Sequence, residues 1–296
     1  MPLILWAPTG DIYDIQRVSY DSDAALVLDG RAVNESFEAG ARLIPTGTYR
    51  AGHQLRIGDN PWPFDESLRA ITQKIFRHKH RVLSVFHETH PDTQPIINLH
   101  GVGTSPYRGP HNSIRRAQEY HTNIIAECLS PIFPHRETPL LYELIPTIEE
   151  ACVIAHLCRE YWWKVVISLY VKRNPEGELC IQNQQGRLIP VVHALKQIED
   201  IANPESSWYA FNCFDPRLVG DLIQLLETSH LWPRVRWMYP NLSDAENDLT
   251  YTPVWDETTE SHLASWNPPG DTMPAFIGAC CGSTTGHIRQ LRALLG

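Results

Sequence analysis

Eight short apolar segments, each followed by a helical pattern or a polar stretch, constrain the fold of this chain more than any other feature. Apolar runs of this length are typical of strands buried on both faces, which occur in parallel sheets covered by helices. The segments are PLILW (2–6), ARLIPTG (41–47), QPIINLHG (94–101), PLLYELIP (139–146), KVVISLYV (164–171), SSWYAFNC (206–213), VRWMYPN (235–241) and PAFIGACC (274–281). Eight such units in 296 residues predict an α/β protein, a (β/α)₈ barrel with a single domain over residues 1–296.

Helical periodicity lies between most of these segments. The expected helices cover about 23–40, 113–129, 147–161, 188–202, 216–230 and 284–296, and Thr147 with Glu150 forms a capping-box pattern. The polar stretch 239–271 is interpreted as a long loop over the barrel mouth, and Cys180 is placed in a polar loop. A doubly wound open sheet is the alternative fold, but no G-x-G-x-x-G follows the first strand.

Composition and charge exclude several classes of protein. The formal net charge of −9 and a pI of about 5.8 disfavour nucleic acid and anionic membranes as partners. No apolar run reaches the ~20 residues of a transmembrane helix, and the first ten residues lack the pattern of a signal peptide. The seven cysteines are scattered without a disulfide framework, which favours a cytoplasmic protein with free, metal-bound or catalytic thiols.

Three cysteines lie where two predicted strands end. Cys213 ends SSWYAFNC, and Cys280 with Cys281 ends PAFIGACC. Catalytic residues of such barrels lie at the carboxyl ends of the strands. Three thiolates at one point would fit a Zn²⁺ site with an open fourth position. A pair of adjacent cysteines is, however, more often two small buried residues than two metal ligands, so both interpretations stay open at this stage.

The motifs around these cysteines resemble the homocysteine S-methyltransferase family. IGACCGSTTGHIRQL is similar to the G-G-C-C-G-T-x-P-x-H-I signature of that family, FNCFDP to N-C-x-x-P, and YELIPTIEEA to E-T-I-P-x-x-x-E-A. FEAGARLIPTGTYRAG resembles A-G-A-x-x-I-x-T-N-T-Y-x-A, and MYPN matches Y-P-N. The matches run in family order from about Phe37 to the C-terminus.

The resemblance implies a TIM barrel that binds one zinc ion through Cys213, Cys280 and Cys281. Zinc would hold homocysteine as a thiolate, which takes a methyl group from a sulfonium donor and becomes methionine. The expected donor is S-methylmethionine or S-adenosylmethionine rather than betaine or a folate. The expected partners are therefore small molecules, and the oligomeric state is open.

Further residues are assigned to substrate binding. In the resemblance, Glu143 matches the glutamate that holds the amino group of homocysteine, whereas the alternative is a surface acid at a helix entry. Asn212 precedes the cysteine of its strand and is a candidate for orienting the backbone there, with a turn role as the alternative. Thr48 and Tyr49 end the second strand and are candidate pocket residues, with core packing as the alternative. Asn241 ends MYPN and is a candidate for fixing the mouth loop, with a simple capping role as the alternative.

The first strand departs from the family pattern, which ends in an aspartate that helps to hold the substrate. In one register, LILW is the first strand and Trp6 stands at the position of the aspartate. In the other, LVLDG supplies Asp29 and Gly30 but leaves almost no room for a crossover helix before the second strand. The first register is preferred, and an abbreviated first β/α unit stays open.

Three alternatives to this enzyme remain. The altered first strand suggests a non-catalytic relative that binds zinc or a thiol, or a methyltransferase for another thiol or a selenol. A histidine-based metal hydrolase rests only on FHETH (86–90) and INLHG (97–101). FHETH lacks the H-E-x-x-H spacing that places two histidines on one helix face. No metal is expected at Cys128, Cys152, Cys158 or Cys180.

Overall fold

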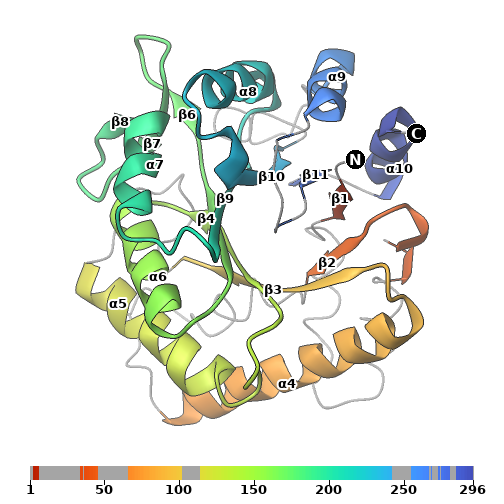
Figure 1. Cartoon of the computed structure of the whole chain (residues 1–296), viewed down its shortest axis with the longest axis vertical. Helices are drawn as coiled ribbons and strands as arrows, with labels where there is room; N and C mark the ends of the chain where they lie inside the picture. Colours follow the sequence, from red (N-terminus) through yellow and green to blue (C-terminus); the bar gives the residue numbers. More distant parts are fainter. Residues whose placement is uncertain are drawn as a thin grey trace.

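Eight parallel strands close into a barrel in the computed structural model (Figure 1), which describes residues 3–6, 34–35, 37–45, 66–101, 114–241, 255–266, 268, 273, 275–280 and 285–295. The order around the barrel is β1-β11-β10-β9-β5-β4-β3-β2, and β1 pairs with both β11 and β2. The strands are β1 Leu3–Trp6, β2 Leu43–Pro45, β3 Gln94–His100, β4 Leu140–Ile145, β5 Val165–Leu169, β9 Ser207–Asn212, β10 Val235–Tyr239 and β11 Phe276–Ala279. Each lies within one of the eight apolar segments, so the predicted barrel is confirmed.

Helices surround this barrel (Figure 1). They are α4 Glu66–Thr89, α5 Ile114–Thr122 with a π-helical continuation Asn123–Leu129, α6 Ile148–Glu160, α7 Val191–Glu199, α8 Val219–Thr228, α9 Glu257–Ser265 and α10 Thr285–Leu295. Short 3₁₀ turns cover Pro216–Leu218 and Trp232–Arg234. Residues 34–35 and 37–38 are helical, and a turn at residues 39–40 follows them. Gly40 in this turn has a φ of 112°, which is accessible mainly to glycine.

Three elements differ from the sequence-based expectations. The long helix α4 was not predicted, and α9 lies inside the stretch interpreted as a loop. The loop assignment failed because Asp256 caps α9 by accepting a bond from the Thr259 amide at 2.8 Å. The placement of Cys180 in a polar loop is wrong, because this residue is fully buried in the small antiparallel sheet β6 Lys172–Arg173, β7 Leu179–Gln182 and β8 Leu188–Pro190.

The first strand follows the preferred register. Leu3–Trp6 pairs in parallel with Phe276–Ala279, so that Trp6 lies opposite Ala279, directly before Cys280. Trp6 is thus the last residue of the first barrel strand. Asp29 and Gly30, the rival assignment, lie outside the described residues.

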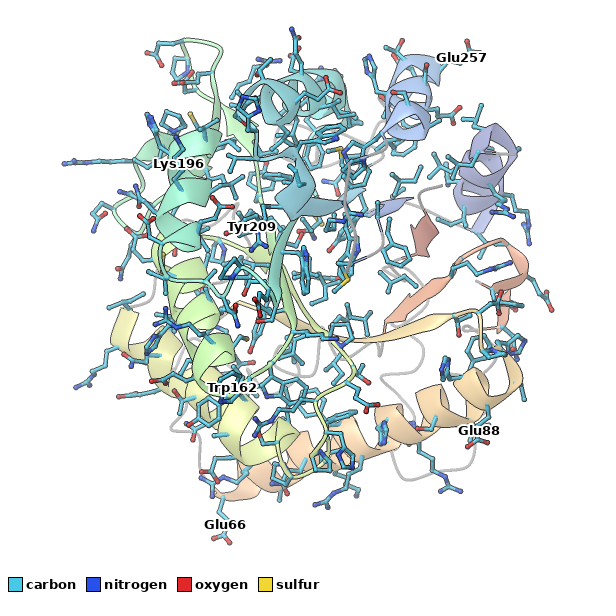
Figure 2. All side chains as sticks on the ribbon, in the orientation of Figure 1. Glu66, Glu88, Trp162, Lys196, Tyr209 and Glu257 are labelled. Atoms are coloured by element: carbon cyan, nitrogen blue, oxygen red, sulfur yellow. The ribbon has the colours of Figure 1, made fainter. Side chains whose placement is uncertain are left out.

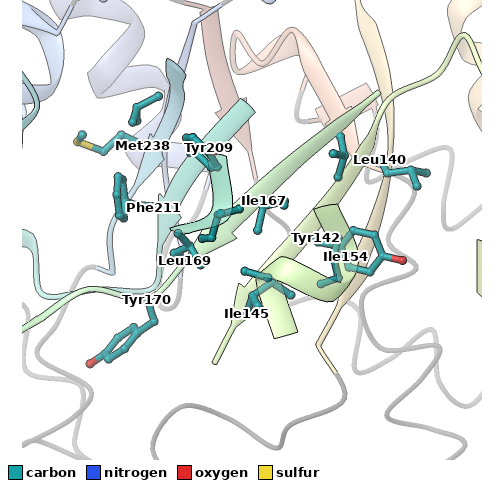
Figure 3. Close-up of a cluster of buried hydrophobic side chains, with 14 of the residues drawn as sticks. Leu140, Tyr142, Ile145, Ile154, Ile167, Leu169, Tyr170, Tyr209, Phe211 and Met238 are labelled. Atoms are coloured by element: carbon teal, nitrogen blue, oxygen red, sulfur yellow. The ribbon is translucent and has the colours of Figure 1, made fainter. Parts of the chain in front are cut away.

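Successive residues of the strands supply two separate cores, because side chains alternate between the faces of a strand. The outer core lies between strands and helices and includes Tyr142, Ile167 and Phe211 (Figure 3). The inner core fills the barrel itself with Leu43, Ile96, Leu141, Val166, Trp208, Ala210, Cys213, Trp237, Tyr239, Met273, Phe276 and Cys280. The two cysteines predicted as ligands that the structure describes are therefore both in the inner core.

Outside these cores the helices present charged side chains to solvent. Glu66, Glu88, Lys196 and Glu257 are exposed on the outer helices, whereas Tyr209 is fully buried on β9 (Figure 2). Trp162 is the most exposed large apolar side chain of the described residues, at 77%. Within the described part of the chain, no helix combines the length and the apolar character needed to span a bilayer.

Candidate active site

Two of the predicted ligand residues, Cys213 and Cys280, flank the carboxyl end of β10. The amide of Cys213 donates to the carbonyl oxygen of Tyr239 at 3.2 Å, and the amide of Cys280 donates to that of Pro240 at 2.7 Å. Both side chains are buried, with 6% and 2% exposure. Two strands that are not neighbours, β9 and β11, thus bring their cysteines to the same end of the barrel.

The backbone at Cys213 is held in an unusual conformation. Its φ of 57° lies in the left-handed region, which costs a residue other than glycine ~1–2 kcal/mol. The Asn241 side chain donates from Nδ2 to the Cys213 carbonyl oxygen at 2.8 Å, and the Asn241 amide donates to Phe214 at 2.9 Å. Asn241, which is 1% exposed, therefore fixes the turn that carries Cys213.

Glu143 lies in β4 and is 6% exposed, so it is not a surface acid. Its Cα lies opposite that of His100 at the end of β3. The β4–β5 register shifts after Tyr142, because Tyr142 pairs with Ile167 and Ile145 with Leu169. Two residues of β4, Glu143 and Leu144, thus face one residue of β5, which is a β-bulge beside a functional position.

The interior position of Glu143 is visible in its effect on Tyr239, a fully buried residue at the end of β10. Burial raises the pKa of the Tyr239 hydroxyl well above its usual range, and the Glu143 carboxylate raises it further. The thiols of Cys280 and Cys213 add to the same shift in the pKa. The carboxylate and both cysteines therefore all influence the same buried phenol electrostatically.

Asn212, fully buried at the end of β9, contacts three of its neighbours. Its Oδ1 accepts from Ser168 Oγ at 2.7 Å and from the Leu144 amide at 3.1 Å. Its Nδ2 donates to Cys213 Sγ at 3.5 Å. The prediction that this amide orients nearby backbone agrees with the contact to Leu144.

Sequence reasoning missed Tyr239 and Ser168 as residues of the site. The signal for both was period-two alternation inside apolar strands: Ser168 follows Val166 on one face of β5, and Tyr239 follows Trp237 on one face of β10. Alternation shows that such residues share a face but does not show which face is the barrel interior.

The described donors fit zinc by their chemistry. Thiolates are soft ligands that zinc prefers, and Cys213 and Cys280 lie buried on either side of one strand end. Among the residues with described positions, no group of three histidine, cysteine, aspartate or glutamate residues forms a metal site. The third predicted ligand, Cys281, lies outside the described residues, as do Thr48 and Tyr49.

Three other cysteines lie outside the barrel interior, in or against the outer core. Burial raises the pKa of the Cys128 thiol to about 12 and that of Cys152 to about 11, and it raises the pKa of Cys158 further still. The expectation that these three cysteines bind no metal stays a prediction.

The FHETH segment lies at the other end of the barrel. It spans the last turn of α4 and the residue after it, and α4 leads into the amino end of β3. The His90 ring stacks on Phe86 with the ring centroids 4.2 Å apart. His87 and His90 are thus remote from the carboxyl ends of the strands, which is unfavourable for a hydrolase site there.

Comparisons with known proteins show the family and the fold of this chain. A family model described as homocysteine S-methyltransferase matches residues 31–295. The structure of the homocysteine methyltransferase MmuM from Escherichia coli, in its apo form, is similar at a TM-score of 0.58 and 16% identity, over 96% of this chain and 92% of that one. A putative alpha-L-fucosidase from Bacteroides thetaiotaomicron gives a TM-score of 0.48 and 11% identity, over 99% and 94%. A search of curated protein sequences found no significant match.

Proposed function

The chain belongs to the homocysteine S-methyltransferase family, and from that premise we propose that it is a zinc-dependent enzyme that transfers a methyl group from a sulfonium donor to L-homocysteine. The products are methionine and the demethylated donor. We propose Cys213, Cys280 and Cys281 as the zinc ligands, and residues 1–296 as one homocysteine-binding domain. In support of the single domain, β1 closes the barrel although it precedes the matched residues.

The observation that carries the proposal is the pair of buried thiols at the end of β10, beside a buried carboxylate. Cys213 and Cys280 lie in the inner core and bond through their amides to the consecutive residues Tyr239 and Pro240, and Glu143 is buried in β4. When bound there, zinc would supply a positive charge that keeps a thiol in its nucleophilic thiolate form at neutral pH. Zinc-binding thiols are therefore expected at the strand ends of the barrel interior and not in the apolar outer core.

Glu143 supplies the second half of the proposed substrate site. A carboxylate on the inner face of the barrel can form a charge-assisted hydrogen bond with a cation. The ammonium group of homocysteine is the cation that we propose, and its thiol would then face the cysteine end of the barrel. Asn241 holds the Cys213 turn in place, and Thr48 with Tyr49 is proposed to line the pocket at the end of β2.

A cationic methyl donor fits the charge of this site. Thiolates and a carboxylate create a negative potential inside the barrel, which favours a sulfonium over an anionic folate. A sulfonium also carries a good leaving group, because loss of its methyl group releases a neutral thioether. We therefore propose S-methylmethionine or S-adenosylmethionine as the donor. We also propose the reducing cytoplasm as its compartment, because Cys128, Cys152, Cys158 and Cys180 form no disulfides within the described residues.

The first test measures zinc content and methionine formation in the same preparation. Purified protein receives homocysteine with S-methylmethionine or, separately, with S-adenosylmethionine. About one equivalent of zinc and methionine formation from one donor are expected, with loss of both in Cys213→Ser. Full turnover by protein stripped of zinc would refute the mechanism.

One observation favours a second candidate, a zinc-binding relative without methyl transfer. Trp6 ends β1 opposite Ala279, next to Cys280, at the position where the family pattern has an aspartate. Zinc at one equivalent without methionine formation from either donor would support this candidate, or an enzyme for another thiol or a selenol. Assays with a panel of thiols and selenols would separate the two.

A further inference from the structure

The Asn212 side chain joins three strand ends of the barrel. It projects from β9, accepts from the Ser168 hydroxyl of β5, and accepts from the Leu144 amide of β4. Because β5 lies between β9 and β4, the bond to Leu144 crosses a whole strand. Asn212 and Ser168 are both fully buried, so neither bond competes with bulk water.

The hydrogen-bond partners determine which way the amide faces. A backbone N–H can only donate, so the atom facing Leu144 must be the oxygen of Asn212. The Ser168 hydroxyl, 2.7 Å from the same atom, then donates as well. The NH₂ end is left to face Cys213 Sγ at 3.5 Å. The two donors on Oδ1 therefore aim an N–H at the sulfur.

The same amide holds two strained backbone positions together. Leu144 has a φ of 55° and Cys213 a φ of 57°, and residues other than glycine rarely adopt such values. Leu144 belongs to the β4 bulge, where the β4–β5 register shifts, and Ser168 is the residue of β5 opposite that bulge. Strain at two positions, each costing ~1–3 kcal/mol, persists only where the surroundings fix it.

From this geometry we propose that Asn212, oriented by Ser168, is a positioning residue that fixes the Cys213 sulfur relative to the Glu143–Leu144 bulge. The inference rests on the proposed function, since it treats Cys213 as a zinc ligand and Glu143 as the substrate carboxylate. In this role Asn212 contacts the Cys213 sulfur through Nδ2 at 3.5 Å, in place of the substrate contact expected from the sequence. Partners of this kind typically contribute 10–100-fold to metal affinity.

A double-mutant cycle on zinc affinity tests this role. The variants are Ser168→Ala, Asn212→Ala and the pair, each titrated with zinc against a competing chelator and with Co²⁺, whose thiolate charge-transfer band reports the sulfur geometry. The matched control is Ser207→Ala, a buried serine at the other end of β9 whose hydroxyl has no partner among the described residues. Thermal unfolding of all variants records any effect on the fold.

We expect zinc affinity to fall when the contacts from Ser168 to Asn212 and from Asn212 to Cys213 are removed. Asn212→Ala should weaken zinc binding about 10- to 100-fold, and Ser168→Ala by a smaller factor. Ser168→Ala should add nothing in the Asn212→Ala background, because it acts through that amide. Both variants should shift the Co²⁺ band, whereas Ser207→Ala should leave affinity and band unchanged. If Asn212→Ala does not fold, Ser168→Ala against Ser207→Ala still decides the matter.

Two results would overturn the inference. The first is a Ser168→Ala variant with the zinc affinity and the Co²⁺ band of the wild type, provided that the wild type binds zinc. This result would refute the positioning role of Ser168 and Asn212 and leave the proposed function intact. A purely structural role would give the same result with a lowered unfolding temperature. Wild-type protein that binds no zinc would overturn the proposed function, and this inference with it.

Discussion

The outer and inner faces of the same barrel strands have opposite chemical character near the carboxyl end. On β5 the outward Ile167 is followed by the inward Ser168, and on β9 the outward Phe211 is followed by the inward Asn212. On β4, β5, β9 and β10 the outward residues stay apolar to the end of the strand and pack on helices (Figure 3). The last inward residues of β5, β9 and β10 are polar, namely Ser168, Asn212 and Tyr239. Stability and chemistry are thus assigned to alternate residues of one strand.

This division explains how the barrel tolerates the cost of its site. The polar end holds a buried carboxylate and two residues with left-handed backbone, which disfavour folding. The outer core, with its many fully buried aliphatic and aromatic side chains, supplies the opposing hydrophobic free energy. Substitutions on the two faces should therefore have separable effects on activity and on stability.

The sharpest test compares two buried cysteines, one from each region. Cys280→Ser should abolish stoichiometric zinc binding and turnover, because a neutral hydroxyl is a poor zinc ligand. Cys158→Ser, in the outer core on α6, should retain zinc and lose roughly 1–3 kcal/mol of unfolding free energy, because its hydroxyl is buried among apolar groups. Zinc analysis, methionine assay and urea unfolding measure these effects. Zinc loss in Cys158→Ser alone would contradict the division.

A large outer side chain should affect stability alone. Phe211 is fully buried on the outer face, directly before Asn212. Phe211→Ala should lower the free energy of unfolding by about 3–5 kcal/mol through lost burial and a cavity. The folded fraction should still bind one zinc ion, since Asn212 and Cys213 point inward. An unchanged urea midpoint with reduced zinc affinity would show that the two faces are coupled.

The sequence was sufficient for the barrel because each strand is a compact apolar run with its own boundaries. It failed where local patterns are weak, as for α9, whose small apolar content lies in a polar stretch, and for Cys180, whose burial depends on a three-stranded sheet formed by distant residues. The capping box was half correct: Thr147 accepts from the Glu150 amide at 3.3 Å, while the Glu150 carboxylate contacts His121 Nε2 at 2.8 Å.

The site could be predicted only as far as short motifs reach. Motif matches predicted Cys213, Cys280 and Glu143 as site residues, and their placement at strand ends follows from the barrel. The contacts of Asn212 with Ser168 and Leu144 join residues 44 and 68 positions apart. Such contacts depend on the closure of the barrel and on the β4 bulge, and no local pattern encodes them. Tyr239 was missed for the same reason.

The last effect that we expect on the inner face concerns substrate affinity rather than zinc affinity. Glu143→Gln keeps the shape of the side chain and removes its charge, so zinc binding should persist. A charged hydrogen bond contributes about 1.5–3 kcal/mol, so KM for homocysteine should rise roughly 10- to 100-fold. The matched substrate is 4-mercaptobutanoate, which keeps the thiol and carboxylate but has no ammonium group. Glu143→Gln should use it as well as the wild type does. An equal loss for both substrates would mean that Glu143 supports the barrel end rather than the ammonium group.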